Sequence, residues 1–297
     1  MSKNKKSIFR GAATALVTPF KDGEIDYISF GRLIDRQIES GIDALVICGT
    51  TGESATLSDE EHHSVLEFAL AKASGRVPMI AGTGSNDTMH AVKMSKFASD
   101  MGYDALLVVT PYYNKATSKG LIKSYYKIAD ATDKPVIVYN VPTRTCCNIP
   151  IDVYRELAKH ENIVAVKEAS GNISDIARLI CECGDDFDVY SGNDDQTLPM
   201  LSLGGAGVIS VVSNIIPSEM AMLCRKWFDG DVDCCRDIHE KYFKLMKDMF
   251  CEVNPIPVKT ALSLMKLCSG ELRLPLCEME EGRLDIFKTT LQRYGLI

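Results

Sequence analysis

Lys167 follows the apolar run 163–166, a pattern that is typical of a strand buried on both faces. Burial disfavours the charged ammonium group and lowers the pKa of a lysine from about 10.4 towards neutrality. The neutral amine can attack a ketone to form a Schiff base, which then acts as an electron sink. Position alone leaves two ordinary alternatives open: a lysine at the rim of the fold, or one paired with Glu168.

Polar residues that could share this chemistry follow other apolar runs. The segment GTTGESATL (49–57) places Thr50 and Thr51 between glycines, where hydroxyl and amide donors could hold a carboxylate. In YNVPTRT, Tyr139 could relay a proton beside an imine, and Arg144 offers a planar fork for a substrate carboxylate. Taken alone, each could equally be a capping threonine, a core-edge tyrosine or a surface arginine.

Eight short apolar runs recur along the chain and are the candidate strands that position these residues. Most of them are continuous rather than alternating, as in parallel strands that are covered on both faces. Segments with helical periodicity separate them, including 28–41 and 58–75, the second of which opens with Ser58 and Glu61 as a capping box. The apolar runs are 11–20, 43–52, 77–85, 104–113, 134–142, 162–170, 187–194 and 206–214.

This alternation predicts a (β/α)8 barrel, and a doubly wound open sheet is the alternative. We favour the barrel because the runs finish in Thr, Tyr, Lys or Ser, and the C-terminal ends of barrel strands converge on one mouth. After about residue 225 the strand pattern stops and helical segments follow. The sequence therefore predicts a barrel catalytic domain at residues 1–225 and a small helical domain at residues 226–297.

Composition narrows the class of protein. The chain has 297 residues, a net charge of -7 and no long basic run, which argues against nucleic-acid binding. No run is long enough to span a membrane, and the basic N-terminus MSKNKKSIF precedes no signal-peptide core, so we expect a cytosolic protein. The eleven cysteines have none of the spacings of a zinc site, so we expect reduced thiols and no metal.

Seven motifs occur in a fixed order: GTTGESATL, PYYNK, YNVPTRT, AVKEASGN, YSGND, GGAGVISV and NPIPVK. In this order they resemble the dihydrodipicolinate synthase family, one of the class I pyruvate-dependent aldolases and lyases, from about Gly11 to the C-terminus. The resemblance implies condensation of pyruvate with L-aspartate 4-semialdehyde to 4-hydroxy-tetrahydrodipicolinate, the first committed step of diaminopimelate and lysine synthesis. It also implies that no metal or organic cofactor takes part, and that the assembly is a homotetramer built as a dimer of dimers.

The same resemblance implies catalytic roles for four residues. Lys167 matches the lysine that forms the Schiff base with pyruvate. Tyr139 matches the tyrosine that shuttles protons, and Thr51 matches its hydroxyl partner. Tyr113 matches a tyrosine that completes the relay from a neighbouring subunit, so the active site would depend on a dimer.

Further matches concern substrate binding and the choice of substrate. Arg144 matches the arginine that receives the carboxylate of aspartate semialdehyde, and Thr50 lies in the carboxylate-binding loop. Gly192 and Ile209 match backbone positions that line the pyruvate pocket. Arg144 and the Thr50-Thr51 pair favour the synthase over sialic-acid lyases, which lack that arginine and resemble Gly-Ser-Thr-Gly-Glu at the first loop. N-acetylneuraminate lyase, another pyruvate lyase and a non-catalytic keto-acid-binding protein stay open as alternatives.

Feedback-sensitive members of the family bind lysine at a dimer interface, and this chain departs from their pattern. Asp59 stands where those members often have His, and His90 stands where they have a Glu that would meet the lysine ammonium. A histidine cannot replace a carboxylate in that role, so we expect weak or absent inhibition by lysine. The alternative is that His62 and His90 are ordinary helix-surface histidines. The matching positions are Ser54, Ala55, Asp59, His62, Asn86, His90 and Tyr112.

Overall fold

The computed structural model describes residue 5 and residues 7–297. Eight strands form a closed barrel in the order β1-β10-β9-β8-β7-β6-β5-β4, which confirms the predicted (β/α)8 fold and rules out the open sheet. Every barrel strand lies within one of the eight predicted runs. The barrel strands are β1 (Gly11–Ala15), β4 (Ala44–Ile47), β5 (Met79–Gly82), β6 (Ala105–Val109), β7 (Val136–Asn140), β8 (Ile163–Glu168), β9 (Asp188–Ser191) and β10 (Gly207–Ser210).

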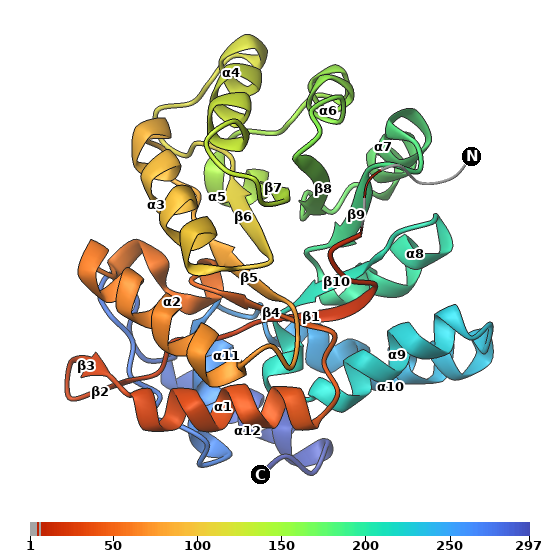
Figure 1. The fold of residues 1–297 in the computed structure, drawn as a ribbon. Helices are drawn as coiled ribbons and strands as arrows, with labels where there is room; N and C mark the ends of the chain where they lie inside the picture. Colours follow the sequence, from red (N-terminus) through yellow and green to blue (C-terminus); the bar gives the residue numbers. More distant parts are fainter. Residues whose placement is uncertain (1–4, 6) are drawn as a thin grey trace. The chain divides into compact units, whose positions relative to one another are not determined.

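The chain divides into two compact units, and the first comprises the residues up to Gly11 together with Pro78–Ile209. In it, β5 to β9 pair in parallel with their sequence neighbours. Helices α3, α4, α6 and α7 lie along the outer side of these strands, each packed on the next (Figure 1). The helices of this unit are α3 (Thr88–Met101), α4 (Ser118–Ala129), α5 (Pro142–Thr145), α6 (Ile151–Leu157), α7 (Ile173–Cys183), η3 (Asp194–Gln196) and α8 (Thr197–Ser202).

The second unit comprises Ala12–Val77 and Ser210–Ile297. Its strands β1 and β4 pair in parallel, α1 packs on α2, and α10 packs on both α9 and α12. A short antiparallel hairpin of β2 (Phe20–Lys21) and β3 (Glu24–Ile25) was not predicted. The helices are α1 (Tyr27–Glu39), η1 (Thr50–Gly52), η2 (Ser54–Thr56), α2 (Asp59–Ala73), η4 (Val212–Asn214), α9 (Pro217–Phe228), α10 (Val232–Asp248), α11 (Ile256–Leu264) and α12 (Glu281–Arg293).

A local signal in the sequence explains where α2 begins. The predicted capping box of α2 is present: the Glu61 amide donates to Ser58 Oγ at 3.2 Å, and the Ser58 amide donates to Glu61 Oε2 at 2.9 Å.

The C-terminal part of the chain is helical, as predicted, and contains α10, α11 and α12. The domain boundary at residue 225 stays a prediction, and it falls inside α9. In the described part of the chain, no helix combines the length and apolar character needed to cross a membrane.

Candidate active site

Lys167 is the fifth residue of β8, the sixth strand of the barrel in chain order, as predicted. Only 5% of the residue is exposed, so it is not a rim lysine. Neighbouring side chains on a strand point to opposite faces, so Glu168 is directed away from Lys167. The Glu168 carboxylate accepts hydrogen bonds from Asn140 and Tyr154, which leaves no support for a Lys167–Glu168 pair.

Tyr139 is the direct neighbour of Lys167 across the β7–β8 ladder. The Nζ atom of Lys167 lies 4.5 Å from the centroid of the Tyr139 ring. Tyr139 is buried as well, and both residues lie next to the carboxyl ends of their strands. The structure thus brings together the predicted nucleophile and the predicted proton shuttle, in a place where water is largely excluded.

The electrostatic setting of Lys167 favours a reactive amine. The pKa of Lys167 is lowered to about 8, mainly because the residue is buried. The carboxylate of Asp194 raises this pKa and the positive charge of Arg144 lowers it, and both effects are included in that value. At pH 7, Lys167 is therefore neutral in about a tenth of the molecules, a far larger fraction than for an exposed lysine. Such a residue can act as a nucleophile near neutral pH.

Gly192 follows β9 and lies against the stem of Lys167. A Cβ atom added to Gly192 would lie 3.2 Å from Lys167 Cε and 2.7 Å from the Cβ of Ala169. Only glycine lets the backbone come this close, which fits its predicted place in the lining of a pyruvate pocket. Ile209, the other predicted lining position, is fully buried in β10.

Arg144 and Tyr113 lie on segments that follow strands of the first unit. Arg144 is exposed on the short helix α5, close enough for its charge to act on Lys167. Tyr113 follows β6, has a left-handed backbone with φ 69°, and is 92% exposed. Its own chain leaves Tyr113 uncovered, so its predicted role in the site of a neighbouring subunit stays a prediction.

Thr50 and Thr51 belong to the second unit, where they form the first two residues of η1. Thr51 is buried, and its Oγ1 accepts a hydrogen bond of 3.0 Å from the Asn254 side chain. The hydroxyl of Thr18 donates to the carbonyl of Gly52 at 2.8 Å and holds the same turn. A rigid turn of this kind can present hydroxyl and amide donors in a fixed direction.

The predicted lysine-binding positions lie on five segments. Ser54 and Ala55 lie in η2, Asp59 and His62 in α2, His90 in α3, and Asn86 and Tyr112 in loops. In the first unit, the Asn114 side chain donates to the Asn86 carbonyl at 2.9 Å and joins the loops of Asn86 and Tyr112. His62 is buried rather than on the helix surface, because it lies on the same face of α2 as apolar residues of the core.

Sequence reasoning missed two groups that act on predicted residues, and the partners of one buried carboxylate beside them. Asp194 is 1% exposed and interacts with Lys167, although it belongs to the quoted motif YSGND. Asn254 belongs to NPIPVK, yet nothing in that motif alone indicates a bond to Thr51. Glu168 accepts hydrogen bonds from Asn140 and Tyr154, which its own motif does not indicate. Each of these contacts joins segments that are distant in the chain.

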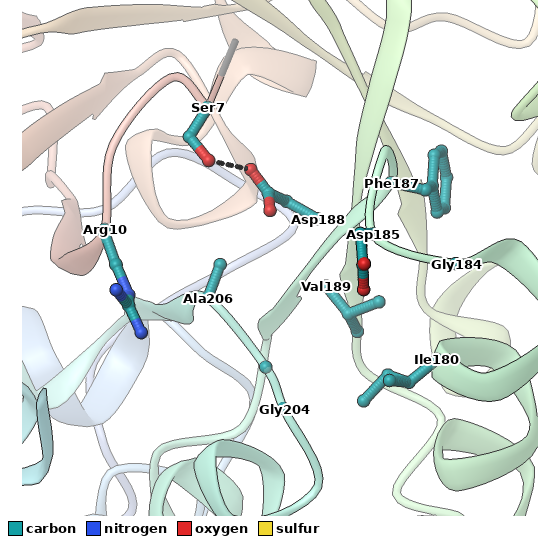
Figure 2. A pocket seen from close by; sticks show the side chains of 11 residues that line it. Ser7, Arg10, Ile180, Gly184, Asp185, Phe187, Asp188, Val189, Gly204 and Ala206 are labelled. Carbon is teal, nitrogen blue, oxygen red and sulfur yellow. Dashed lines mark hydrogen bonds between the residues drawn. The ribbon is translucent and has the colours of Figure 1, made fainter. Parts of the chain in front are cut away.

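A different pocket of about 300 Å³ lies in the first unit (Figure 2). In it the Ser7 hydroxyl donates to Asp188 Oδ2 at 2.6 Å, with Arg10 and Asp185 nearby in the lining. Asp188 begins β9, so this pocket adjoins the amino end of a barrel strand, the end that carries stability rather than catalysis in this fold. None of the predicted site residues lines it.

Among the described residues, no group of three or more His, Cys, Asp or Glu side chains is placed to hold a metal ion. All eleven cysteines are free thiols. The predicted site residues offer an amine, a phenol, hydroxyl groups and a guanidinium.

Comparison with known proteins shows which family the chain resembles over nearly its whole length. The model of the Dihydrodipicolinate synthetase family matches residues 8–294. The chain is 50% identical over 293 residues to the 4-hydroxy-tetrahydrodipicolinate synthase of Acetivibrio thermocellus, covering 99% of this chain and 100% of that relative. These matches confirm the resemblance that the ordered motifs carry.

Solved structures agree with the sequence comparison. Dihydrodipicolinate synthase from Thermotoga maritima superposes with a TM-score of 0.96 at 43% identity, over 98% of this chain and 100% of that chain. The dihydrodipicolinate synthase from Aquifex aeolicus gives a TM-score of 0.95 at 46% identity, over 97% and 99% of the two chains. At this level of identity the likeness extends beyond the fold.

Proposed function

The chain belongs to the dihydrodipicolinate synthetase family, and from this premise we propose that it is a 4-hydroxy-tetrahydrodipicolinate synthase that condenses pyruvate with L-aspartate 4-semialdehyde. The observation that carries the proposal is the buried Lys167, whose pKa is lowered to about 8 and whose Nζ lies against Tyr139. The reaction is inferred from the relatives, which are named 4-hydroxy-tetrahydrodipicolinate synthase. The roles proposed below are those that residues of this chain could take in that reaction.

The first half of the reaction makes the Schiff base. The neutral amine of Lys167 adds to the C2 ketone of pyruvate, and the carbinolamine loses water to give an imine. Tyr139 carries the protons that this addition and dehydration require, with Thr51 and Tyr113 as its hydroxyl partners. Gly192 packs closely against the stem of Lys167, and together with Thr50 and Ile209 it belongs to the predicted pocket.

The second half forms a carbon–carbon bond and closes a ring. Loss of a methyl proton from the imine gives an enamine, whose terminal carbon attacks the aldehyde of aspartate semialdehyde. Arg144 holds the carboxylate of that substrate through its planar fork. The amino group of the adduct then attacks the imine carbon, the bond to Lys167 breaks, and the free amine is regenerated. No metal or organic cofactor takes part.

A side-by-side assay of the purified protein tests the substrate. One arm supplies pyruvate with aspartate semialdehyde and couples the product to the downstream reductase. The other arm supplies N-acetylneuraminate and follows release of pyruvate. We expect turnover only in the first arm. Turnover only in the second arm would retain the Schiff-base lysine but replace the acceptor, and no turnover in either would favour a binding protein for keto acids.

We also propose that the enzyme is a homotetramer that responds weakly to lysine. The 92% exposure of Tyr113 supports a partner chain at that surface. Histidine at position 90 gives the ammonium group of lysine no carboxylate to bind. Added lysine should therefore leave turnover nearly unchanged at concentrations that saturate feedback-sensitive enzymes, while His90→Glu should introduce inhibition. Strong inhibition of the unmodified enzyme would contradict this proposal.

A further inference from the structure

Strands β7 and β8 carry two adjacent pairs of residues with different surroundings. Tyr139 faces Lys167 across the ladder, and the next pair along is Asn140 and Glu168. Successive residues on a strand point to opposite faces, so the second pair lies behind the first. The pKa of Lys167 is lowered by burial and by Arg144 and raised by Asp194, so Glu168 matters to the site through its hydrogen bonds.

Glu168 is a buried carboxylate, 3% exposed, that receives donors from several segments. The Asn140 side chain donates to both oxygens, at 3.1 and 3.0 Å. The hydroxyl of Tyr154, from α6, donates to Oε2 at 2.7 Å. The Ser170 amide, from the loop after β8, donates to Oε1 at 2.7 Å. A charged acceptor with such partners forms strong hydrogen bonds where water is excluded.

Asn140 extends the network to the segment that carries Arg144. Its side-chain amide donates to Asn148 Oδ1 at 2.8 Å, and its Oδ1 accepts from the Ile149 backbone amide at 3.3 Å. These bonds tie the end of the segment between β7 and α6 back to its start. Arg144 lies on α5 within this segment.

We propose that Glu168 is a positioning residue that fixes Lys167, Tyr139 and the Arg144 segment from behind the site. Through its hydrogen bonds to Asn140, Tyr154 and Ser170, Glu168 connects β7 to α6 and to the loop after β8. The proposal rests on the function proposed above, because it concerns the geometry in which Lys167 attacks pyruvate. A displacement of about 1 Å in a reacting group can cost on the order of a hundredfold in rate.

The network predicts a graded response to substitution. Glu168→Gln keeps the shape but turns one acceptor into a donor, which must face Ser170 or Tyr154. Glu168→Ala removes every acceptor and leaves buried donors unpaired. We expect the rate at which borohydride traps the pyruvate adduct to fall about tenfold in the first variant and about a hundredfold in the second.

Asp188→Asn is the matched control. Asp188 is also a strand carboxylate of the first unit and accepts from the Ser7 hydroxyl, but it lies at the amino end of β9. Its substitution should leave the trapping rate unchanged even if the melting temperature falls. All rates are measured well below the melting temperature of each variant, so that loss of folded protein does not enter.

The pH profile separates positioning from a charge effect. A residue that acts through geometry lowers the plateau of the trapping rate but leaves its midpoint near the Lys167 pKa of about 8. Three outcomes would overturn the proposal. The two Glu168 variants could trap the adduct at the normal rate, or keep the plateau of the unmodified enzyme while the midpoint shifts, or both fail to fold. Absence of trapping in the unmodified enzyme would instead refute the proposed function.

Discussion

Lys167 must lose its proton before it can attack a ketone, so its pKa governs the first step of the proposed reaction. Because the pKa is lowered to about 8, the neutral fraction should rise about tenfold from pH 7 to pH 9 and then level off. The initial rate of pyruvate-dependent borohydride trapping should follow that curve. An exposed lysine would give a rate that rises about a hundredfold over the same range with no plateau, and such a result would contradict the assigned environment.

Arg144 acts in two ways that substitution can separate. Arg144→Met removes the fork for the semialdehyde carboxylate and should raise KM for that substrate about 10- to 100-fold. It also removes a positive charge that lowers the Lys167 pKa, so the midpoint of the trapping profile should move to higher pH.

The control for Arg144 is Arg144→Lys, which keeps the charge but loses the planar fork. Its trapping midpoint should stay near that of the unmodified enzyme, while KM for the semialdehyde still rises. A midpoint that moves equally in both variants would mean that the charge of Arg144 does not reach Lys167.

For single residues, the sequence predicts the environment of a side chain only when the residues that create it are close in the chain. Lys167 follows an apolar run directly, so its burial could be predicted. Asp194 reaches Lys167 only because β8 and β9 pair, and a motif does not indicate that contact. Strand alternation places Glu168 on the opposite face from Lys167, but the sequence does not indicate which residues surround it there.

The loop 49–57 is held by an ion pair that its own sequence does not reveal. Glu53 has a left-handed backbone with φ 52° between η1 and η2. Its carboxylate pairs with Lys259 of α11, and both side chains are 0–1% exposed. The Lys259 ammonium also donates to the Glu271 carbonyl at 2.8 Å and lies 4.1 Å from the ring centroid of Phe20.

This pair predicts a strong dependence of stability on both partners. Glu53→Gln leaves the Lys259 ammonium buried without its counter-charge, and should lower the free energy of unfolding by about 3–5 kcal/mol. Adding Lys259→Met to that variant should recover part of the loss, because neither charge is then left buried alone. Denaturant unfolding of the two single variants and the double variant measures the coupling.

The exposed pair of Asp233 and Arg236 provides the comparison. Its side chains are 85% and 56% exposed, so Asp233→Asn should cost less than about 1 kcal/mol. Equal losses at Glu53 and Asp233, or strictly additive losses in the Glu53 and Lys259 variants, would contradict a buried pair that holds the loop.

Elements were predictable where a periodic pattern was long or a cap was local. All eight barrel strands and the capping box of α2 follow from such patterns. The hairpin of β2 and β3 has only two residues in each strand, too few for an alternation to stand out. The two 3-10 turns η1 and η2 depend on contacts with Thr18, Asn254 and Lys259, which the loop's own residues do not predict.

At the scale of the whole molecule, the alternation of apolar runs with helical segments predicted the barrel, and the order of the motifs predicted the family. The assembly could not be predicted from such patterns, because residues that meet across an interface need share no pattern in sequence. Tyr113 links the assembly to the proposed active site. It is 92% exposed in its own chain, yet the proposed proton relay requires it beside an imine.

Mixed oligomers decide whether Tyr113 serves the neighbouring subunit. Lys167→Ala and Tyr113→Ala each inactivate every site when expressed alone. If Tyr113 acts in the partner's site, a dimer with one chain of each kind holds one site with both residues and one with neither. Random mixing of equal amounts makes half of the dimers mixed, so about a quarter of the unmodified activity should return. If Tyr113 instead serves its own chain, no site in any mixture has both residues, and activity stays absent after the subunits have exchanged.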